Sequence, residues 1–333
     1  MGGTMLDLMK IVREKARKAR KRICIAEAED ERVLRAVDAL VKEKITDIVL
    51  IGNEKKIREH AKEFKTNLGS SEIIDIQSYK DKDILVTELY ELRKHKGLSR
   101  QQAKKLLEDY NYFGCMLLHV GKVDAFCSSC VCSTAELMRP SLQVIKTREG
   151  ISTASEIMVF IDRKKDRVFF ASDGSIVIEP TAEQLADIAL NAADVCSSFG
   201  FEPKVAMLSY STHGSGEHPI LTPIREAIKI IREKKPGLII DGEIQFDAAT
   251  NPVSAKRKCH KGDVLKGEAN VLVFPNLSAA NILGHAWIQL GVPEYQFGIS
   301  AGMRKPIVIY GRSATWEKIR DLTILAQMEA NMF

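Results

Sequence analysis

The sequence predicts an α/β fold with mainly parallel sheets covered by helices on both faces. Short apolar runs typical of strands alternate along the chain with segments whose apolar residues have helical spacing. Because the crossover between two parallel strands is usually a helix, this alternation indicates parallel sheets. A hydrophobic content of 45% in 333 residues is enough for two cores of this kind.

The first part of the chain shows the alternation clearly. Asp30 is expected to cap the helix that follows the first strand, and another helix is expected over 84–93. A capping box formed by Ser133 and Glu136 predicts a helix start at Ser133, and Pro140 is expected to kink that helix. The strands expected here are Ile23–Ala26, Ile48–Ile51, Ile73–Ile76 and Ala125–Cys127.

The pattern changes near Gly150. Ile157–Ile161 and Val168–Ala171 are expected to form an antiparallel hairpin, because they flank a short and highly charged turn. Thr181–Gln184 is expected to cap another helix. Further strands are expected at Val205–Leu208, Leu238–Ile240, Asn270–Phe274 and Ile307–Tyr310, and helices at Ile220–Ile231 and Ala279–Leu290.

The segment Lys204–His218, KVAMLSYSTHGSGEH, joins a strand to a helix through a loop rich in hydroxyl groups and glycine. Such a junction offers free backbone N–H groups and the positive end of a helix dipole, and glycine lets a ligand approach the backbone. The pattern indicates an anion site, with phosphate as the expected guest. The alternative is an ordinary surface loop whose hydroxyl groups cap the helix.

Composition and charge exclude several classes of function. The net charge of +5 suits anionic metabolites but is too small to indicate nucleic-acid binding, and the basic run Arg13–Arg22 is expected to be the solvated face of an opening helix. No apolar run reaches the roughly 18 residues of a membrane helix, and the start lacks the apolar core of a secretory signal. Seven cysteines in such a chain indicate reduced thiols. We expect a cytoplasmic protein that binds neither nucleic acid nor membranes.

Two clusters contain residues of the metal-ligand type. Cys127–Cys132 carries a CxxCxC pattern, but no second pair of cysteines and no nearby histidine completes a set of four ligands. Asp241, Glu243 and Asp247 lie within DGEIQFDAA, where metal binding and acid–base work compete with simple turn formation. We expect no metal.

Three arginines stand at the ends of expected elements rather than in charged runs. These are Arg93, Arg139 and Arg312. A planar guanidinium group binds phosphate through two parallel hydrogen bonds, so arginines that converge on one cleft would form an anion site. Taken one at a time, each arginine is equally suited to a surface ion pair, and the sequence does not itself show that they converge.

The chain resembles the phosphate acetyl/butyryltransferase family from about Leu6 to the last helix. The matching segments, in the order and spacing of the family, are AEAEDERVLRA, TDIVLIGN, YELRKHKG, STAELMRPSLQVIKT, KVAMLSYSTHGS, DGEIQFDAA, GEANVLVFPNL and MRKPI. The resemblance implies two three-layer α/β/α domains with a ligand cleft between them, the second inserted into the first. The expected boundaries are 1–149 with 299–333 for the first domain and 150–298 for the second. It also implies a homodimer.

The resemblance further implies a reaction, the exchange of an acetyl group between coenzyme A (CoA) and inorganic phosphate. The CoA thiol would attack the carbonyl of the acyl phosphate, so the site must hold phosphate, accept the thiol proton and stabilise the developing oxyanion. CoA and acetyl-CoA are substrates, and no permanently bound cofactor is implied, because the acyl phosphate is already activated.

The family's phosphate-contacting arginines match Arg93, Arg139 and Arg312. Hydroxyl or N–H groups of Ser128, Ser133 and Ser211 are expected to complete the phosphate site. No residue is assigned to CoA.

This chain departs from the family at two places. After KPI the family has Asn-Asp-Leu-Ser-Arg-Gly, with an aspartate six residues beyond that arginine, whereas this chain has Gly311 at the serine position and Lys318 at the aspartate position. Ser313 and Glu317 are the neighbouring candidates for the missing hydroxyl and carboxylate, so the expected catalytic residues are Arg312, Ser313 and Glu317. The family's Val-Ser-Gly-Ala-(Ala/Val)-His-Ser also corresponds to Cys127–Ser133, which lacks the glycine and the histidine.

Two alternatives follow from these departures. One is a protein of the same fold that binds CoA or an acyl phosphate without turnover. The other is a transferase for a longer acyl chain such as butyryl, with Val308 and Ile309 enlarging an apolar wall.

Overall fold

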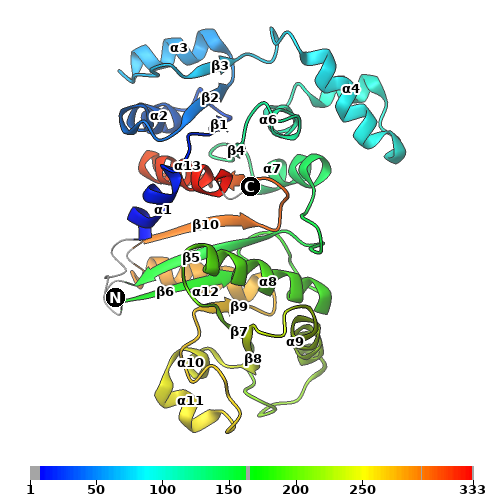
Figure 1. The fold of residues 1–333 in the computed structure, drawn as a ribbon, viewed down its shortest axis with the longest axis vertical. Helices are drawn as coiled ribbons and strands as arrows, with labels where there is room; N and C mark the ends of the chain where they lie inside the picture. Colours follow the sequence, from blue (N-terminus) through cyan, green and yellow to red (C-terminus); the bar gives the residue numbers. More distant parts are fainter. Residues whose placement is uncertain (1–7, 163–165, 294, 332–333) are drawn as a thin grey trace. The chain divides into compact units, whose positions relative to one another are not determined.

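The computed structural model describes residues 8–162, 166–293 and 295–331. The chain divides into two compact units, one made of Thr147–Gly302 and the other of Met9–Lys146 with Met303–Phe333 (Figure 1). Each unit contains a sheet with parallel strands and helices, which confirms the predicted fold class. The domain boundaries expected above stay a prediction.

The unit that is split in sequence has a fully parallel sheet. Its strands are β1 (Arg22–Ile25), β2 (Asp47–Ile51), β3 (Glu72–Ile74), β4 (Ala125–Ser128) and β11 (Ile307–Ile309). The order across the sheet is β11-β4-β1-β2-β3. The chain therefore winds from β1 towards β3 in one direction and continues with β4 and β11 on the other side of β1.

Helices cover both faces of this sheet. Phe126 of β4 lies against Gly114 of α6, whereas its neighbour Cys127 lies close to Tyr310 and to Glu329 of α13. Because successive side chains of a strand point to opposite faces, α6 and α13 lie on opposite sides. The helices of this unit are α1 (Leu8–Ala16), α2 (Glu31–Glu43), α3 (Glu54–Glu63), α4 (Lys82–Arg93), η2 (Lys94–Lys96), α5 (Arg100–Leu106), α6 (Tyr110–His119), α7 (Thr134–Pro140), the π-helical turn η3 (Ser141–Ile145) and α13 (Trp316–Ala330).

The contiguous unit has a mixed sheet of six strands. Its strands are β5 (Ser155–Asp162), β6 (Arg167–Ser172), β7 (Lys204–Leu208), β8 (Ile239–Ile244), β9 (Val271–Val273) and β10 (Tyr295–Ala301), in the order β10-β5-β6-β9-β7-β8. Strands β5 and β6 pair antiparallel, which confirms the predicted hairpin, and β6, β9, β7 and β8 are parallel. Strand β10 was not predicted.

Helices also cover both faces of the second sheet. Phe169 of β6 contacts Trp287 of α12, whereas the adjacent Phe170 contacts Phe199, the residue after α8. Alternation along the strand therefore separates α12 from α8. The helices of this unit are α8 (Ala182–Ser198), η4 (Pro219–Leu221), α9 (Thr222–Lys234), α10 (Phe246–Thr250), α11 (Pro252–Lys258) and α12 (Leu277–Gln289).

The three predicted helix caps are confirmed. The side chain of Asp30 accepts a hydrogen bond from the N–H of Arg32, and both Ser133 and Thr181 form complete capping boxes. Pro140 ends α7, and the chain continues as the π-helical turn η3. This agrees with the loss of a helical hydrogen bond at proline.

The basic run 13–22 differs from its prediction. Helix α1 ends at Ala16, and Arg22 already belongs to β1. Arg13 forms ion pairs with Glu43 and Asp321, so partners far along the sequence, rather than solvent alone, take up its charge. Within the described ranges, no helix has both the length and the apolar character needed to span a bilayer.

Candidate active site

The candidate site lies at the carboxyl ends of three neighbouring strands of the split unit, β1, β4 and β11. Ligands of open α/β sheets bind at this edge, at the point where the winding direction reverses. In this unit the reversal falls between β1 and β4. The loops that follow β1, β4 and β11 are therefore the candidate walls of the site.

The loop after β4 is held by one carboxylate from the loop after β1. Glu27 Oε2 accepts hydrogen bonds from the N–H groups of Cys130 and Val131, at 2.7 and 3.0 Å, and Glu27 Oε1 accepts one from the N–H of Cys132 at 2.6 Å. Burial raises the pKa of Glu27, but hydrogen bonds from Cys130 and from the loop backbone outweigh it and lower the pKa overall. Three successive N–H groups that suit an anion are thus occupied by the chain's own carboxylate.

Arg32 joins the loop after β4 to the loop after β11. Its Nε and Nη2 donate to the two carboxylate oxygens of Asp30, at 2.9 and 2.8 Å. Nη2 also donates to the carbonyl of Cys130 at 2.8 Å, and Nη1 donates to the carbonyls of Arg312 and Ala314, at 2.8 and 3.2 Å. All five N–H donors of the guanidinium group are therefore used.

The three arginines predicted for phosphate binding belong to this unit, and Arg139 shares one neighbour with each of the other two. The charges of Arg139 and Arg93 both lower the pKa of Tyr112, although burial raises it overall. Hydrogen bonds from Ser133 lower the pKa of Glu136, and the charges of Arg139 and Arg312 lower it further. Arg139 therefore acts on Tyr112 together with Arg93, and on Glu136 together with Arg312.

Exposure separates these arginines from the supporting residues. Arg139 of α7 and Arg312 in the loop after β11 are exposed, and Arg93 at the end of α4 is half-buried. Ser128 is fully buried and its hydroxyl donates to Asn111 Oδ1 at 2.7 Å. The hydroxyl of Ser133 donates to its capping partner Glu136. Both serine hydroxyl groups therefore make hydrogen bonds that stabilise the loop after β4 and the start of α7.

The candidates for the missing catalytic groups are exposed. Ser313 lies in the loop after β11 and Glu317 in the first turn of α13. A backbone hydrogen bond at the helix start and one from Thr315 lower the pKa of Glu317, which makes this carboxylate a weaker proton acceptor. Gly311 has a positive φ of 83°, so a serine at this position would be strained as the loop stands.

The apolar residues considered for a longer acyl chain lie inside strand β11. Val308 is 1% exposed and Ile309 is 7% exposed. Both side chains are therefore part of the core of this unit and do not line an open wall.

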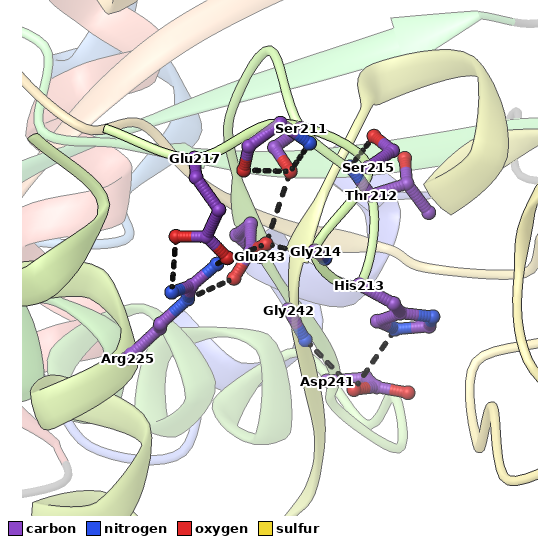
Figure 2. A network of polar contacts seen from close by, with 11 residues as sticks. Ser211, Thr212, His213, Gly214, Ser215, Glu217, Arg225, Asp241, Gly242 and Glu243 are labelled. Atoms are coloured by element: carbon purple, nitrogen blue, oxygen red, sulfur yellow. Dashed lines mark hydrogen bonds and ion pairs between the residues drawn. The ribbon is translucent and has the colours of Figure 1, made fainter.

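The predicted anion loop, residues 209–216, lies in the contiguous unit and binds a carboxylate from outside the loop. The hydroxyl of Ser211 and the N–H of Gly214 donate to Glu243 Oε1, at 3.0 and 2.8 Å (Figure 2). Arg225 binds both oxygens of Glu243, with Nε on Oε2 at 2.8 Å, and also pairs with the exposed Glu217. Two of the donors that the sequence indicated for phosphate, the Ser211 hydroxyl and the Gly214 N–H, are thus engaged by Glu243, and Ser211 itself is fully buried.

A break in strand pairing aims Glu243 at this loop. In the β7–β8 pair, Met207 is opposite Gly242 and Leu208 is opposite Ile244, so Glu243 is the extra residue of a bulge. The hydrogen bonds from Arg225 hold the pKa of Glu243 at about 2, against the effect of burial.

Asp241 and His213 form a second contact beside this network. His213 Nε2 lies 3.3 Å from Asp241 Oδ1, a contact marked by a dashed line in Figure 2. The ring of His213 also stacks on that of His260. Asp247, the third carboxylate of DGEIQFDAA, pairs with Lys258 in α11. The three carboxylates therefore have separate partners.

The cysteines of the CxxCxC pattern also have separate surroundings. Burial raises the pKa of Cys127 to about 12, and the thiol of Cys130 donates to Glu27. Cys132 Sγ accepts a hydrogen bond from Asn111 at 3.4 Å. In the part of the chain that the structure describes, no three side chains of the His, Cys, Asp or Glu type are placed to hold a metal ion.

Sequence reasoning missed two residues of this site, Glu27 and Arg32. Both lie in AEAEDERVLRA, where only Asp30 received a role, as a helix cap. Their partners are backbone atoms of distant loops, which leave no pattern of side chains to recognise. The clustering of charged residues directly after a predicted strand was the one available signal.

Comparison with known proteins identifies the fold and the family. Residues 7–327 match the family described as phosphate acetyl/butaryl transferase. The chain belongs to this family. The assignment made from the sequence motifs is therefore confirmed, and these transferases supply close relatives over the whole chain.

Two curated members of the family and one solved structure illustrate the likeness. The phosphate acetyltransferase of Bacillus subtilis is 38% identical over 326 residues, which are 98% of this chain and 100% of the relative. The phosphate acetyltransferase of Clostridium acetobutylicum is 36% identical over 331 residues, 98% of this chain and 99% of the relative. The crystal structure of a phosphotransacetylase from Streptococcus pyogenes matches with a TM-score of 0.94 at 35% identity, covering 99% of this chain and 100% of that one.

Proposed function

We propose that this chain is a phosphate acetyltransferase, which transfers an acetyl group between CoA and inorganic phosphate. In the direction of acetyl-CoA synthesis, the CoA thiol loses its proton and attacks the acetyl carbonyl of acetyl phosphate. A carbon–sulfur bond forms, the bond from the carbonyl carbon to the phosphate oxygen breaks, and phosphate leaves. The similarity to phosphate acetyltransferases over the full chain supports this reaction.

The observation that carries the proposal for the site is that three arginines of one unit act on two neighbouring groups, with Arg139 acting on both. Arg93 and Arg139 act on Tyr112, and Arg139 and Arg312 act on Glu136, all in one compact unit. Guanidinium groups bind phosphate oxygens strongly and neutralise the charge of the leaving phosphate. These three residues are proposed to bind phosphate, with Arg312 also stabilising charge in the transition state.

The hydroxyl and carboxylate side chains are proposed to have two kinds of role, catalytic and structural. Ser313 is exposed beside Arg312 and is the proposed hydroxyl donor, and Glu317 is the proposed acceptor of the thiol proton. Ser128 and Ser133 are proposed to contribute by shaping the loop after β4, because their hydroxyl groups are committed within it. Ser211 is proposed to support the loop of the other unit through Glu243.

The remaining proposals concern the location, the oligomeric state and the partners of the protein. We propose that it acts in the cytoplasm as a homodimer. We also propose that its partners are small-molecule substrates, a CoA thioester and phosphate, and that the reaction needs no resident metal or cofactor.

A second candidate function is binding of CoA or acetyl phosphate without turnover. Two observations favour it. Gly311 and Lys318 replace the serine and aspartate expected from the resemblance, and the lowered pKa of Glu317 weakens its replacement as a base. Loss of a general base typically costs about 10²- to 10⁴-fold in rate, which leaves binding intact.

A thiol-release assay with acetyl-CoA and phosphate separates these functions. Release of free CoA supports the acetyltransferase, and release only with butyryl-CoA supports a longer acyl chain. Absence of release with both, together with calorimetric binding of CoA, supports the binding protein.

The arginine proposal is tested in the same assay. Arg312→Ala should raise the KM for phosphate about 10- to 100-fold, the scale of one charged hydrogen bond. Arg58→Ala is the matched control, because Arg58 is an exposed arginine of the same unit that pairs with Glu54 along its own helix. An unchanged KM for phosphate in Arg312→Ala removes Arg312 from the site.

A further inference from the structure

The guanidinium group of Arg32 connects two loops that border the proposed phosphate site. It donates to the carbonyl of Cys130 in the loop after β4 and to the carbonyls of Arg312 and Ala314 in the loop after β11. Among these acceptors is the backbone of Arg312, the arginine assigned to phosphate. The contact therefore acts on Arg312 itself rather than on a distant part of its loop.

We propose that Arg32 is a positioning residue that sets the place of Arg312 by holding the loops after β4 and β11 together. This inference rests on the proposed function, since it concerns how Arg312 is positioned to bind phosphate. Arg32 does not bind phosphate in this arrangement, because all five of its N–H donors have acceptors within the chain.

Only arginine provides this set of contacts. Asp30 binds the Nε and Nη2 edge side-on, which fixes the plane of the guanidinium group and leaves the remaining donors facing the loop carbonyls. A lysine at position 32 would bring three donors on a single nitrogen, so it can keep Asp30 and one carbonyl but cannot span both loops. The hydrogen bonds to Asp30 also raise the pKa of Arg32, so the group stays charged.

The loop after β11 depends on such an external contact. Arg312 and Ser313 are exposed and Gly311 has a positive φ. The internal turn is closed by the N–H of Ala314, which donates to the carbonyl of Gly311 at 3.0 Å. Without Arg32, the carbonyls of Arg312 and Ala314 lose their shared donor. A displacement of about 1 Å in a substrate-positioning group can reduce the rate about 100-fold.

The test compares Arg32→Lys with Arg312→Ala and with the double variant. Arg32→Lys should lower kcat/KM for phosphate about 10- to 100-fold. Because Arg32 acts through Arg312, adding Arg32→Lys to Arg312→Ala should change kcat/KM by less than about threefold. Effects that multiply in the double variant would overturn the proposal, since they would show that Arg32 acts independently of Arg312.

A second measurement does not depend on turnover. Hydrogen–deuterium exchange of the segment 310–315 should rise in Arg32→Lys, and stay as in the parent protein in Arg35→Ala. Arg35 is the matched control because it belongs to the same helix α2 and pairs only with the exposed Glu31 in the contacts described. Unchanged exchange of 310–315 in Arg32→Lys would also overturn the proposal. If that variant does not fold, Arg32→Gln replaces it in both measurements.

These measurements keep the two proposals apart. If the parent protein shows no acetyl exchange, the proposed function fails while the deuterium exchange of 310–315 still decides whether Arg32 holds the loop.

Discussion

Replacing Glu243 by glutamine tests how the loop of residues 209–216 is held together. The carboxylate is 3% exposed and binds Arg225 through both oxygens. Its pKa falls from 4.5 to about 2, led by the hydrogen bond from Arg225. Each tenfold change in proton affinity equals about 1.4 kcal/mol, so the fall corresponds to about 3 kcal/mol. Solvent screening reduces this, because Arg225 is 38% exposed, and we expect Glu243→Gln to lower the free energy of unfolding by about 2 kcal/mol at pH 7.

The loss should depend on pH with a defined sign. The folded pKa is depressed, so the stabilisation is complete above pH 4.5 and is lost as the pH falls towards about 2. By pH 3, less than about half of the difference between parent and variant should remain.

Urea denaturation followed by tryptophan fluorescence measures this difference. The chain has two tryptophans, and Trp287 lies in the same unit as Glu243 while Trp316 lies in the other. Both proteins therefore carry Trp316→Phe, which leaves Trp287 as the reporter. Glu217→Gln is the control, because this exposed carboxylate shares Arg225 but should change stability little. A difference that stays constant between pH 7 and pH 3 would refute the electrostatic reasoning.

Three further predictions concern the split unit, each checked by urea denaturation with Trp316 as reporter. Ser133→Ala should lower the free energy of unfolding by about 1 kcal/mol through loss of the capping box with Glu136, and an unchanged midpoint would contradict the cap. Gly114→Ala should lower it by about 1–3 kcal/mol, because the added Cβ would lie 2.2 Å from the ring of Phe126, and full stability would show that the ring moves freely. Glu329 has a buried, unpartnered Oε1 among the described atoms, and burial raises its pKa to about 8. The parent therefore loses stability as the pH rises from 4.5 through 8, so the advantage of Glu329→Gln should grow over this range, and an equal gap at pH 5 and pH 8 would count against it.

The sequence predicted those elements whose own residues specify them. Strands such as β1 and β2 are short apolar runs, and the starts of α7 and α8 carry capping boxes, so both were placed within a few residues. Strand β10 was missed because YQFGISA contains glycine and polar residues, and its strand conformation depends on pairing with β5, far back in the chain. Helix α6 was missed because it is buried on nearly all sides, which removes the helical period of polar residues.

The site shows the same division. Arginines at the ends of elements and the junction after β7 were recognisable from residue type and spacing, but the phosphate expected at this junction stays a prediction, because two of its donors bind the chain's own carboxylate of Glu243. Glu243 reaches this loop because of a bulge in β8, and no local sequence pattern predicts this bulge. The roles of Glu27 and Arg32 depend on loops that approach from other strands, so they required the fold itself.

The position of β11 affects how this protein is made. During synthesis the ribosome releases Thr147–Gly302 as one uninterrupted stretch, so that unit can complete its sheet while translation continues. The other unit has to wait, because strand β11, which pairs with β4, and helix α13 emerge only after Gly302. Until then, the nascent chain exposes the open edge of β4 and the apolar face that α13 will cover. Premature termination after Gly302 would therefore spare the unit of Thr147–Gly302 and leave the split unit as a target for chaperones and proteases.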